Sequence, residues 1–218
     1  MSVLVLAPLG LEARAVRRGA GDLQVMRVGP GPRRARRAAA RLPAEPPAIA
    51  VVGLAGALTD GPAPGDLVVA SEVRSPGGEV FSCPRAGWLA RELGGEGAGV
   101  WLGPLVSHPQ LAVAGARRRL ARSGALAVDM ETAWLAAGLG AGAQPLAAVR
   151  AIVDTPSAEL LRPGTAWRAR RALRALGQVG PALRGWGELV ASSADDWPAA
   201  ASGPDTAGRE PRTMGGVS

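Results

Sequence analysis

The stretch "AIAVVGLAGALTDGPAPGDLVVASEV", residues 48–73, decides the fold class of this chain. It holds two short apolar runs, 48–58 and 65–73, and both are rich in valine and alanine. Runs of this length that end in turn residues predict buried β-strands. Glycine and proline fill the connection between them, so we expect a glycine-rich loop there, with a turn at Gly65 and Asp66.

Strands and helices alternate on both sides of this stretch. Further strands are predicted where short apolar runs occur, within 2–10 and 23–31, each of which ends in a glycine-containing turn, and at 98–106, 125–128 and 145–154. Helices are predicted where the spacing is helical, from residue 11 and over 33–42, 88–93, 111–124, 130–139 and 166–190. This alternation predicts one α/β domain around a largely parallel sheet.

The length of 218 residues suits one sizeable domain, which we expect to span residues 1–191. From residue 192 onward the sequence is dominated by alanine, serine, glycine, proline and aspartate. Such a composition buries too little apolar surface to order a chain, so 192–218 is predicted to be a disordered C-terminal tail.

The net charge of +7 would suit a nucleic-acid partner. All of the basic residues are arginine, because the sequence has no lysine, and this is typical of the codon usage of a GC-rich genome. The arginines are dispersed and no aromatic residues alternate with them, as a base-stacking surface would require. We therefore expect no nucleic-acid partner, and a basic nucleic-acid-binding module remains as an alternative.

The sequence has one cysteine and one histidine, and this limits its disulfide and metal chemistry. Cys83 is the only cysteine and His108 the only histidine, so neither a disulfide framework nor a cysteine- or histidine-rich metal site is expected. The N-terminus lacks the basic segment of a signal peptide, and no apolar run is long enough to span a membrane. A cytoplasmic enzyme without metal or cofactor is the expectation.

Acidic residues and glycines follow several of the predicted strands. In α/β sheets ligands bind beyond the carboxyl ends of the strands, so these positions should share one crevice. The positions selected in this way are Glu12, 29–31, 53–56, Ser107, Met130, Glu131 and Asp154. Three carboxylates in one crevice can cleave an N-glycosidic bond without a metal, since they can assist the leaving base, hold the sugar hydroxyls and position a nucleophile.

Four segments in the same order resemble the nucleoside phosphorylase and nucleosidase family. They are "APLGLEAR" at 7–14, the glycine-rich segment at 51–73, "ALAVDMETAWLA" at 125–136 and "VRAIVD" at 149–154. The resemblance covers about residues 1–190. It implies a three-layer α/β/α sandwich with a central, mostly parallel mixed sheet, and a purine nucleoside as substrate. It also implies a homo-oligomer, with a dimer favoured.

The resemblance also implies a role for each acid. Asp154 corresponds to the general acid at purine N7, and Glu12 to the base that activates water in methylthioadenosine/adenosylhomocysteine nucleosidases. Glu131 corresponds to the residue that binds the ribose 2′- and 3′-hydroxyls, with Met130 packed against the sugar. Asp129 is then expected at the strand end, bonded to backbone or to a basic neighbour.

Other contacts with the substrate follow from the same comparison. The implied substrate-binding positions are Ala55 and Gly56 in the loop beneath base and sugar, together with Ser107 and Leu111. Gly10, followed four residues later by Arg14, resembles the phosphate loop of hexameric phosphorylases, so phosphorolysis stands beside hydrolysis.

Two departures refine the resemblance. Leu111 stands where the methylthioadenosine/adenosylhomocysteine nucleosidases carry a stacking phenylalanine, and Val153 stands where a serine usually precedes the catalytic aspartate. The motifs are more similar to those of the adenosylhopane nucleosidases of hopanoid biosynthesis, which release adenine from a nucleoside with a large apolar 5′ group. A methylthioadenosine/adenosylhomocysteine or futalosine-type nucleosidase is the alternative.

Each acid also has a purely structural interpretation. Asp154 precedes Thr155 and Pro156, so it could cap a helix. Glu131 and Glu12 could be acids of a first helical turn that complement the helix dipole. A non-catalytic nucleoside-binding module of the same fold would keep the glycines and lose an acid.

Overall fold

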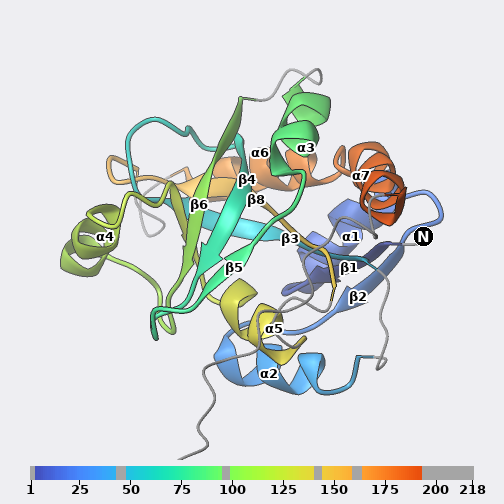
Figure 1. Cartoon of the computed structure of the whole chain (residues 1–218). Helices are drawn as coiled ribbons and strands as arrows, with labels where there is room; N and C mark the ends of the chain where they lie inside the picture. Colours follow the sequence, from blue (N-terminus) through green and yellow to red (C-terminus); the bar gives the residue numbers. More distant parts are fainter. Residues whose placement is uncertain (1–2, 43–47, 95–98, 140–143, 159–163, 193–218) are drawn as a thin grey trace, which may run out of the picture.

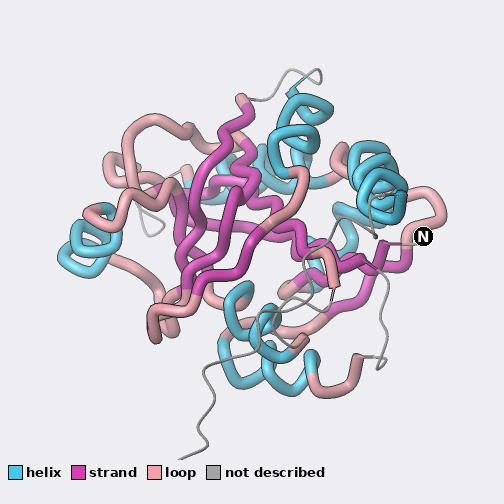
Figure 2. The backbone as a smooth tube through the Cα atoms, viewed as in Figure 1, coloured by secondary structure: helices cyan, strands magenta, loops and turns pink. Residues whose placement is uncertain are grey.

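The computed structural model describes residues 3–42, 48–94, 99–139, 144–158 and 164–192 (Figure 1). These residues form one central sheet with helices packed on both of its sides, which Figure 2 shows as a core of strands surrounded by helices. The fold is the expected α/β/α arrangement. The predicted tail lies outside the described residues from 193 onward, and Ser192 is the last residue of a helix.

Strand β3 is the centre of the first half of the sheet. β1 (Val3–Ala7) pairs in parallel with β2 (Gln24–Arg27) on one side and with β3 (Ala48–Ala57) on the other. β3 also pairs in parallel with β8 (Leu146–Asp154) along most of its length. The last residue of β8 lies opposite Gly56, after a shift in register, so β3 and β8 end side by side.

The remaining strands turn the sheet back upon itself. They are β4 (Leu67–Arg74), β5 (Val80–Ser82), β6 (Val100–Ser107) and β7 (Ala127–Asp129). β4 pairs with β8, β6 with β4, and β7 with both β6 and β3, so five strands close a ring of hydrogen-bonded pairs. Among the described strands, five of the eight pairings are parallel, which agrees with the predicted largely parallel sheet. The closed ring and the short edge strand β5 were not predicted.

Helices cover the two sides of the sheet in separate groups. The first group is α1 (Gly10–Gly19), α3 (Ala86–Leu93), α6 (Thr165–Leu176) and α7 (Gly180–Ser192), linked by contacts of α1 with α6 and of α7 with α1 and α3. The second group is α2 (Pro32–Ala39) with α5 (Thr132–Gly138), which pack against each other. α4 (Ala114–Ala121) lies apart from both, at the far left of Figure 1. None of the described helices is long and apolar enough to cross a membrane.

The single helix predicted over 166–190 is wrong, because the structure has two helices there. α6 ends at Leu176 with Gly177 as its C-cap, and α7 begins at Gly180. A Cβ atom added to Gly180 would lie 2.0 Å from the carbonyl oxygen of Gly19 at the end of α1. The backbones of α1 and α7 therefore touch, and this contact between distant segments is invisible to helical periodicity.

We expect Gly180→Ala to lower the free energy of unfolding by roughly 1–3 kcal/mol or more, because overpacking forces backbone to move. The methyl group would meet backbone of α1 rather than a flexible side chain. Gly94→Ala is the matched control, since an added Cβ there meets nothing within 4 Å. Urea denaturation of both variants checks this, and equal stabilities would contradict the close packing of α1 on α7.

Candidate active site

Glu12 connects the end of β1 to the middle of β3. It lies in the first turn of α1 and is only 2% exposed. The backbone N–H of Leu9 donates to its Oε2 over 2.5 Å, and the N–H of Leu54 donates to its Oε1 over 2.8 Å. Burial raises the pKa of Glu12 above its usual value, and these backbone donors offset the rise in part. Glu12 is thus an early-helix acid that also reaches β3.

Glu131 connects the end of β7 to the loop after β2. The N–H of Gly31 donates to its Oε1 over 2.7 Å, and the N–H of Met130 donates to its Oε2 over 3.3 Å. The side chain makes no capping bond to its own helix, so the interpretation as a simple helix-terminal acid does not account for it. Burial, and next the charge of Asp129, raise the pKa of Glu131 to about 7.

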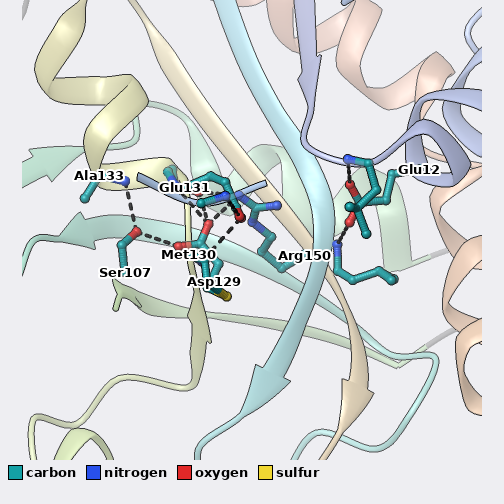
Figure 3. Close-up of polar contacts among 11 residues, drawn as sticks. Glu12, Ser107, Asp129, Met130, Glu131, Ala133 and Arg150 are labelled. Carbon is teal, nitrogen blue, oxygen red and sulfur yellow. Dashed lines mark hydrogen bonds and ion pairs between the residues drawn. The ribbon is translucent and has the colours of Figure 1, made fainter. Parts of the chain in front are cut away.

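A buried network surrounds Asp129 (Figure 3). Its carboxylate pairs with the Arg150 guanidinium and accepts hydrogen bonds from the Ser107 hydroxyl (2.5 Å) and from the N–H (3.1 Å) and hydroxyl of Thr132. The expectation that Asp129 bonds to backbone or to a basic neighbour is confirmed, since it does both. Ser107 is fully buried, and its oxygen also accepts from the N–H of Ala133 over 2.9 Å. Ser107 therefore links Asp129 to the first turn of α5.

Arg150 is a central residue that the sequence reasoning missed. It lies on β8, is fully buried, and points toward Asp129 and Glu131 in Figure 3. Its positive charge lowers the pKa values of both Glu12 and Glu131. Its Nε and Nη1 atoms have no hydrogen-bond partner within the described part of the chain. The signal was available, because one arginine inside the apolar run 145–153 must be paired when that run is buried.

Gly53 makes room for this meeting of charges. A Cβ atom on Gly53 would lie 2.4 Å from Arg150 Nη1 and 3.0 Å from Glu12 Oε1. Any other residue at this point of β3 would push the cation and the carboxylate away from the strand. The glycine is therefore required by the close approach of Arg150 and Glu12.

Asp154 ends β8 and pairs with Arg117 of α4, a second arginine that the sequence reasoning did not select. Both side chains are about 95% buried. Arg117 also donates to the carbonyl oxygens of Ala57 (2.9 Å) and Ala112 (3.3 Å). A Cβ on Gly56 would lie 2.9 Å from Asp154 Oδ1, so a glycine is again needed where charge approaches β3.

The capping interpretation of Asp154 is wrong for the residues that the structure describes. Residues 156–158 form a bend, and no helical turn begins at Thr155. Thr155 holds this bend, since its N–H and hydroxyl oxygen both bond to the backbone of Ala158. The Asp154 carboxylate faces Arg117 instead.

Several predicted positions meet at a small cavity next to Asp154. The cavity has a volume of about 30 Å³, and Gly56, Leu111, Met130, Arg117 and Asp154 all line it. Glu12 and Arg150 approach β3 at Gly53, and Asp154 and Arg117 approach it at Gly56, three residues further along the strand.

The other predicted positions lie at the margin of this arrangement. Ala55 is buried within β3 between the two glycines. Gly10 and Arg14 are exposed on α1, so the structure does not bring Arg14 into the buried cluster of charges. Among the described residues, no three histidine, cysteine, aspartate or glutamate side chains are grouped so that they could hold a metal ion.

Comparison with known proteins identifies the fold. No family model and no curated protein matches the sequence. Among solved structures, the 5′-methylthioadenosine/S-adenosylhomocysteine nucleosidase from Neisseria meningitidis superposes with a TM-score of 0.70 at 20% identity, covering 84% of this chain and 99% of that one. A putative methylthioadenosine nucleosidase from Weissella paramesenteroides gives 0.69 at 17% identity, covering 86% and 97%.

The 5′-methylthioadenosine/S-adenosylhomocysteine nucleosidase from Helicobacter pylori has a similar structure as well. It gives a TM-score of 0.67 at 15% identity and covers 90% of this chain and 98% of that one. At these identities the likeness establishes the architecture alone. The chain therefore has the fold of these nucleosidases over nearly their whole length.

The raised pKa of Glu131 predicts a pH-dependent stability. The folded protein holds a proton on Glu131 up to about pH 7, whereas the unfolded chain loses it near 4.5, so the free energy of unfolding should fall as pH rises through this window. Glu131→Gln removes the titrating group. The free energy of unfolding of this variant should therefore fall less with rising pH than that of the wild type, by a difference of at most about 3 kcal/mol.

Urea denaturation between pH 5 and pH 8 measures this slope. Glu92→Gln is the matched control, because Glu92 is exposed on α3 and should leave the slope unchanged. A slope that Glu131→Gln does not alter would contradict the buried, proton-binding state of this carboxyl.

Proposed function

We propose that this protein is a purine nucleosidase that cleaves the N-glycosidic bond of an adenine nucleoside. The observation that carries the proposal is that two sets of buried charged side chains approach β3, Glu12 with Arg150 at Gly53 and Asp154 with Arg117 at Gly56. We propose that one set acts on the nucleophile and the other on the departing base of a single glycosidic bond.

Glu12 and Arg150 suit the activation of water. A carboxyl with a raised pKa is a better proton acceptor near neutral pH than an ordinary glutamate. The unpartnered N–H groups of Arg150 can hold the oxygen of the attacking molecule. A phosphate dianion is disfavoured, because Glu12 and Glu131 lie close to this arginine and Arg14 is exposed elsewhere on α1. We therefore propose hydrolysis rather than phosphorolysis.

In this proposal Glu131 and Met130 contact the sugar, and Asp154 contacts the base. Each Glu131 oxygen accepts one backbone hydrogen bond and has a further lone pair for a ribose hydroxyl. Met130 lines the cavity that Asp154 also lines, so an apolar contact lies beside a polar one. A group that protonates or hydrogen-bonds N7 of the purine assists its departure. Structural neighbours support this use of the fold, since the N. meningitidis protein binds methylthio-immucillin-A.

Asp154→Asn should lower kcat for adenine release by roughly 10²–10⁴, and Glu12→Gln by a similar factor, because each removes a group that acts on the reacting atoms. Asp60→Asn and Glu92→Gln are the matched controls, since both side chains are exposed. Release of adenine from a panel of nucleosides, with and without phosphate, measures these effects.

Two results would contradict the proposal. One is the absence of base release from every nucleoside tested, and nucleoside binding without release would then identify a non-catalytic binding module. The other is full activity of Asp154→Asn. An absolute requirement for phosphate would overturn hydrolysis and favour a phosphorylase.

The 5′ side of the substrate is proposed to carry a large apolar group, as in 5′-adenosylhopane. Leu111, which lines the Asp154 cavity, is 45% exposed, and Val113, two residues further along the chain, is 47% exposed, so an apolar substituent could cover both side chains. The second candidate is methylthioadenosine or adenosylhomocysteine, because the structural neighbours are nucleosidases for these compounds.

Adenosines with 5′-alkyl chains of graded length distinguish the two candidates. If the group packs on Leu111 and Val113, kcat/KM should rise by up to about fourfold per methylene, mainly through KM. Leu111→Ser should flatten this dependence, and Val80→Ser, exposed on the edge strand β5, should not. Equal or better use of methylthioadenosine would contradict the apolar 5′ substituent and support the second candidate.

A further inference from the structure

A groove with a volume of about 600 Å³ lies between α1 and α6. Apolar side chains of both helices line this groove, and so do three exposed arginines, Arg18 of α1 and Arg170 and Arg174 of α6. No acidic side chain is among the described residues that line it. The groove therefore carries positive charge directly beside apolar surface.

The two most exposed large apolar side chains of the described part of the chain are on the same two helices. Leu11, in the first turn of α1, is 64% exposed, and Trp167, in the first turn of α6, is 62% exposed. Leu11 lines the groove, and the Arg171 guanidinium lies 5.7 Å from the centroid of the Trp167 ring. Two such side chains on adjoining helices, beside a groove, indicate a surface that a partner covers.

The helices α1 and α6 run side by side in the same direction. A Cβ atom on Gly19 would lie 1.9 Å from the carbonyl oxygen of Gly177, so the ends of the two helices touch. Leu11 near the start of α1 lines the same groove as Ala166 near the start of α6. The first turn of α1 also holds Glu12, whose carboxylate reaches β3. The two exposed apolar side chains thus lie at the end of the helices that is next to the candidate active site.

The combination of charge and apolar surface restricts the chemistry of the partner. Anionic phospholipid headgroups attract arginine, while leucine and tryptophan side chains enter the boundary between headgroups and acyl chains. A second copy of this chain is disfavoured on the same surface, because two grooves lined by arginine repel each other. A nucleic acid would attract the arginines through its phosphates but would leave Leu11 without an apolar contact.

Helix α2 shows that positive charge alone does not make such a surface. Arg33, Arg36 and Arg37 are exposed on α2, which is as rich in arginine as α6. Its sequence contains no large apolar residue, so it offers nothing that could enter a lipid layer. This helix is therefore a control for effects of charge within the same protein.

We propose that the α1/α6 surface, formed by Leu11, Arg18, Trp167, Arg170 and Arg174, docks on an anionic phospholipid membrane. The guanidinium groups contact lipid phosphates, and the leucine and tryptophan side chains enter the boundary between headgroups and acyl chains. Docking presents the active-site end of α1 to the lipid, where a substrate with a large apolar group would be dissolved. The inference goes beyond the proposed function and does not rest on it, because docking is measured without substrate.

The variant Arg18→Gln, Arg170→Gln, Arg174→Gln tests the contribution of charge. The measurement is co-sedimentation of the full chain with vesicles of phosphatidylglycerol and phosphatidylcholine, and with vesicles of phosphatidylcholine alone. The wild type should bind the anionic vesicles only. The variant should bind them about 100-fold more weakly, because one arginine near an anionic surface contributes about fivefold.

The matched control is Arg33→Gln, Arg36→Gln, Arg37→Gln on α2, which removes the same charge from exposed positions. This control should weaken vesicle binding less than fivefold, since α2 does not contact the lipid in the proposed orientation. Equal losses in the two triple variants would overturn the proposal, because binding would then follow the overall positive charge. Equal binding of the wild type to both kinds of vesicle would overturn it as well.

Trp167→Ser tests the apolar contribution, with Val80→Ser on the edge strand β5 as its control, because Val80 is also exposed. Trp167→Ser should weaken binding to the anionic vesicles by about 10-fold, and Val80→Ser should leave it unchanged. Brominated lipids should quench part of the tryptophan fluorescence of the wild type and less of that of Trp167→Ser. Equal quenching in both proteins would contradict insertion of Trp167.

Two further results separate this inference from its alternatives. Binding of a DNA duplex in preference to vesicles, weakened by the same arginine substitutions, would overturn the membrane partner and identify a nucleic acid instead. Failure to bind anionic vesicles would overturn the inference even if the protein releases adenine from nucleosides. Vesicle binding without base release from any nucleoside would contradict the proposed function and support the docking surface.

Discussion

The buried ion pair between Arg150 and Asp129 is the interaction on which the site depends. It joins β8 to β7, and through Ser107 and Thr132 it reaches β6 and the start of α5. A charge in a fully buried strand is tolerated only when a partner and hydrogen bonds compensate its loss of water. The positive charge of Arg150 also acts beyond this pair. It lowers the pKa values of Glu12 and Glu131, which burial has raised.

Strand β3 carries the two places where charged groups approach backbone. Gly53 faces Arg150 and Glu12, and Gly56 faces Asp154 and Arg117. One arginine and one carboxylate thus approach β3 at each of these glycines. The closed ring of strands supports this geometry, since β7 and β8 both pair with β3 and deliver their terminal aspartates beside it.

Much of the fold could be predicted because it depends on local pattern. Apolar runs such as 48–58 and 145–154 became β3 and β8 nearly as expected. Glu12 and Glu131 lie close enough to influence each other's charge. The failures have a common cause. The break at Gly177 depends on the contact of α7 with α1, and the pairing of Arg150 with Asp129 depends on β8 lying near β7, so both rest on segments distant in sequence.

The sequence by itself determined the order of strands and helices, the positions of the glycines and the three carboxylates of the site, because these are local properties of spacing and residue type. The tertiary structure alone decided which charges pair. Arg150 lies 21 residues from Asp129, and Arg117 lies 37 residues from Asp154. Nothing in local periodicity links such partners. They meet because β7 and β8 both pair with β3 and because α4 places Arg117 over the end of β8, where burial then makes each pairing obligatory.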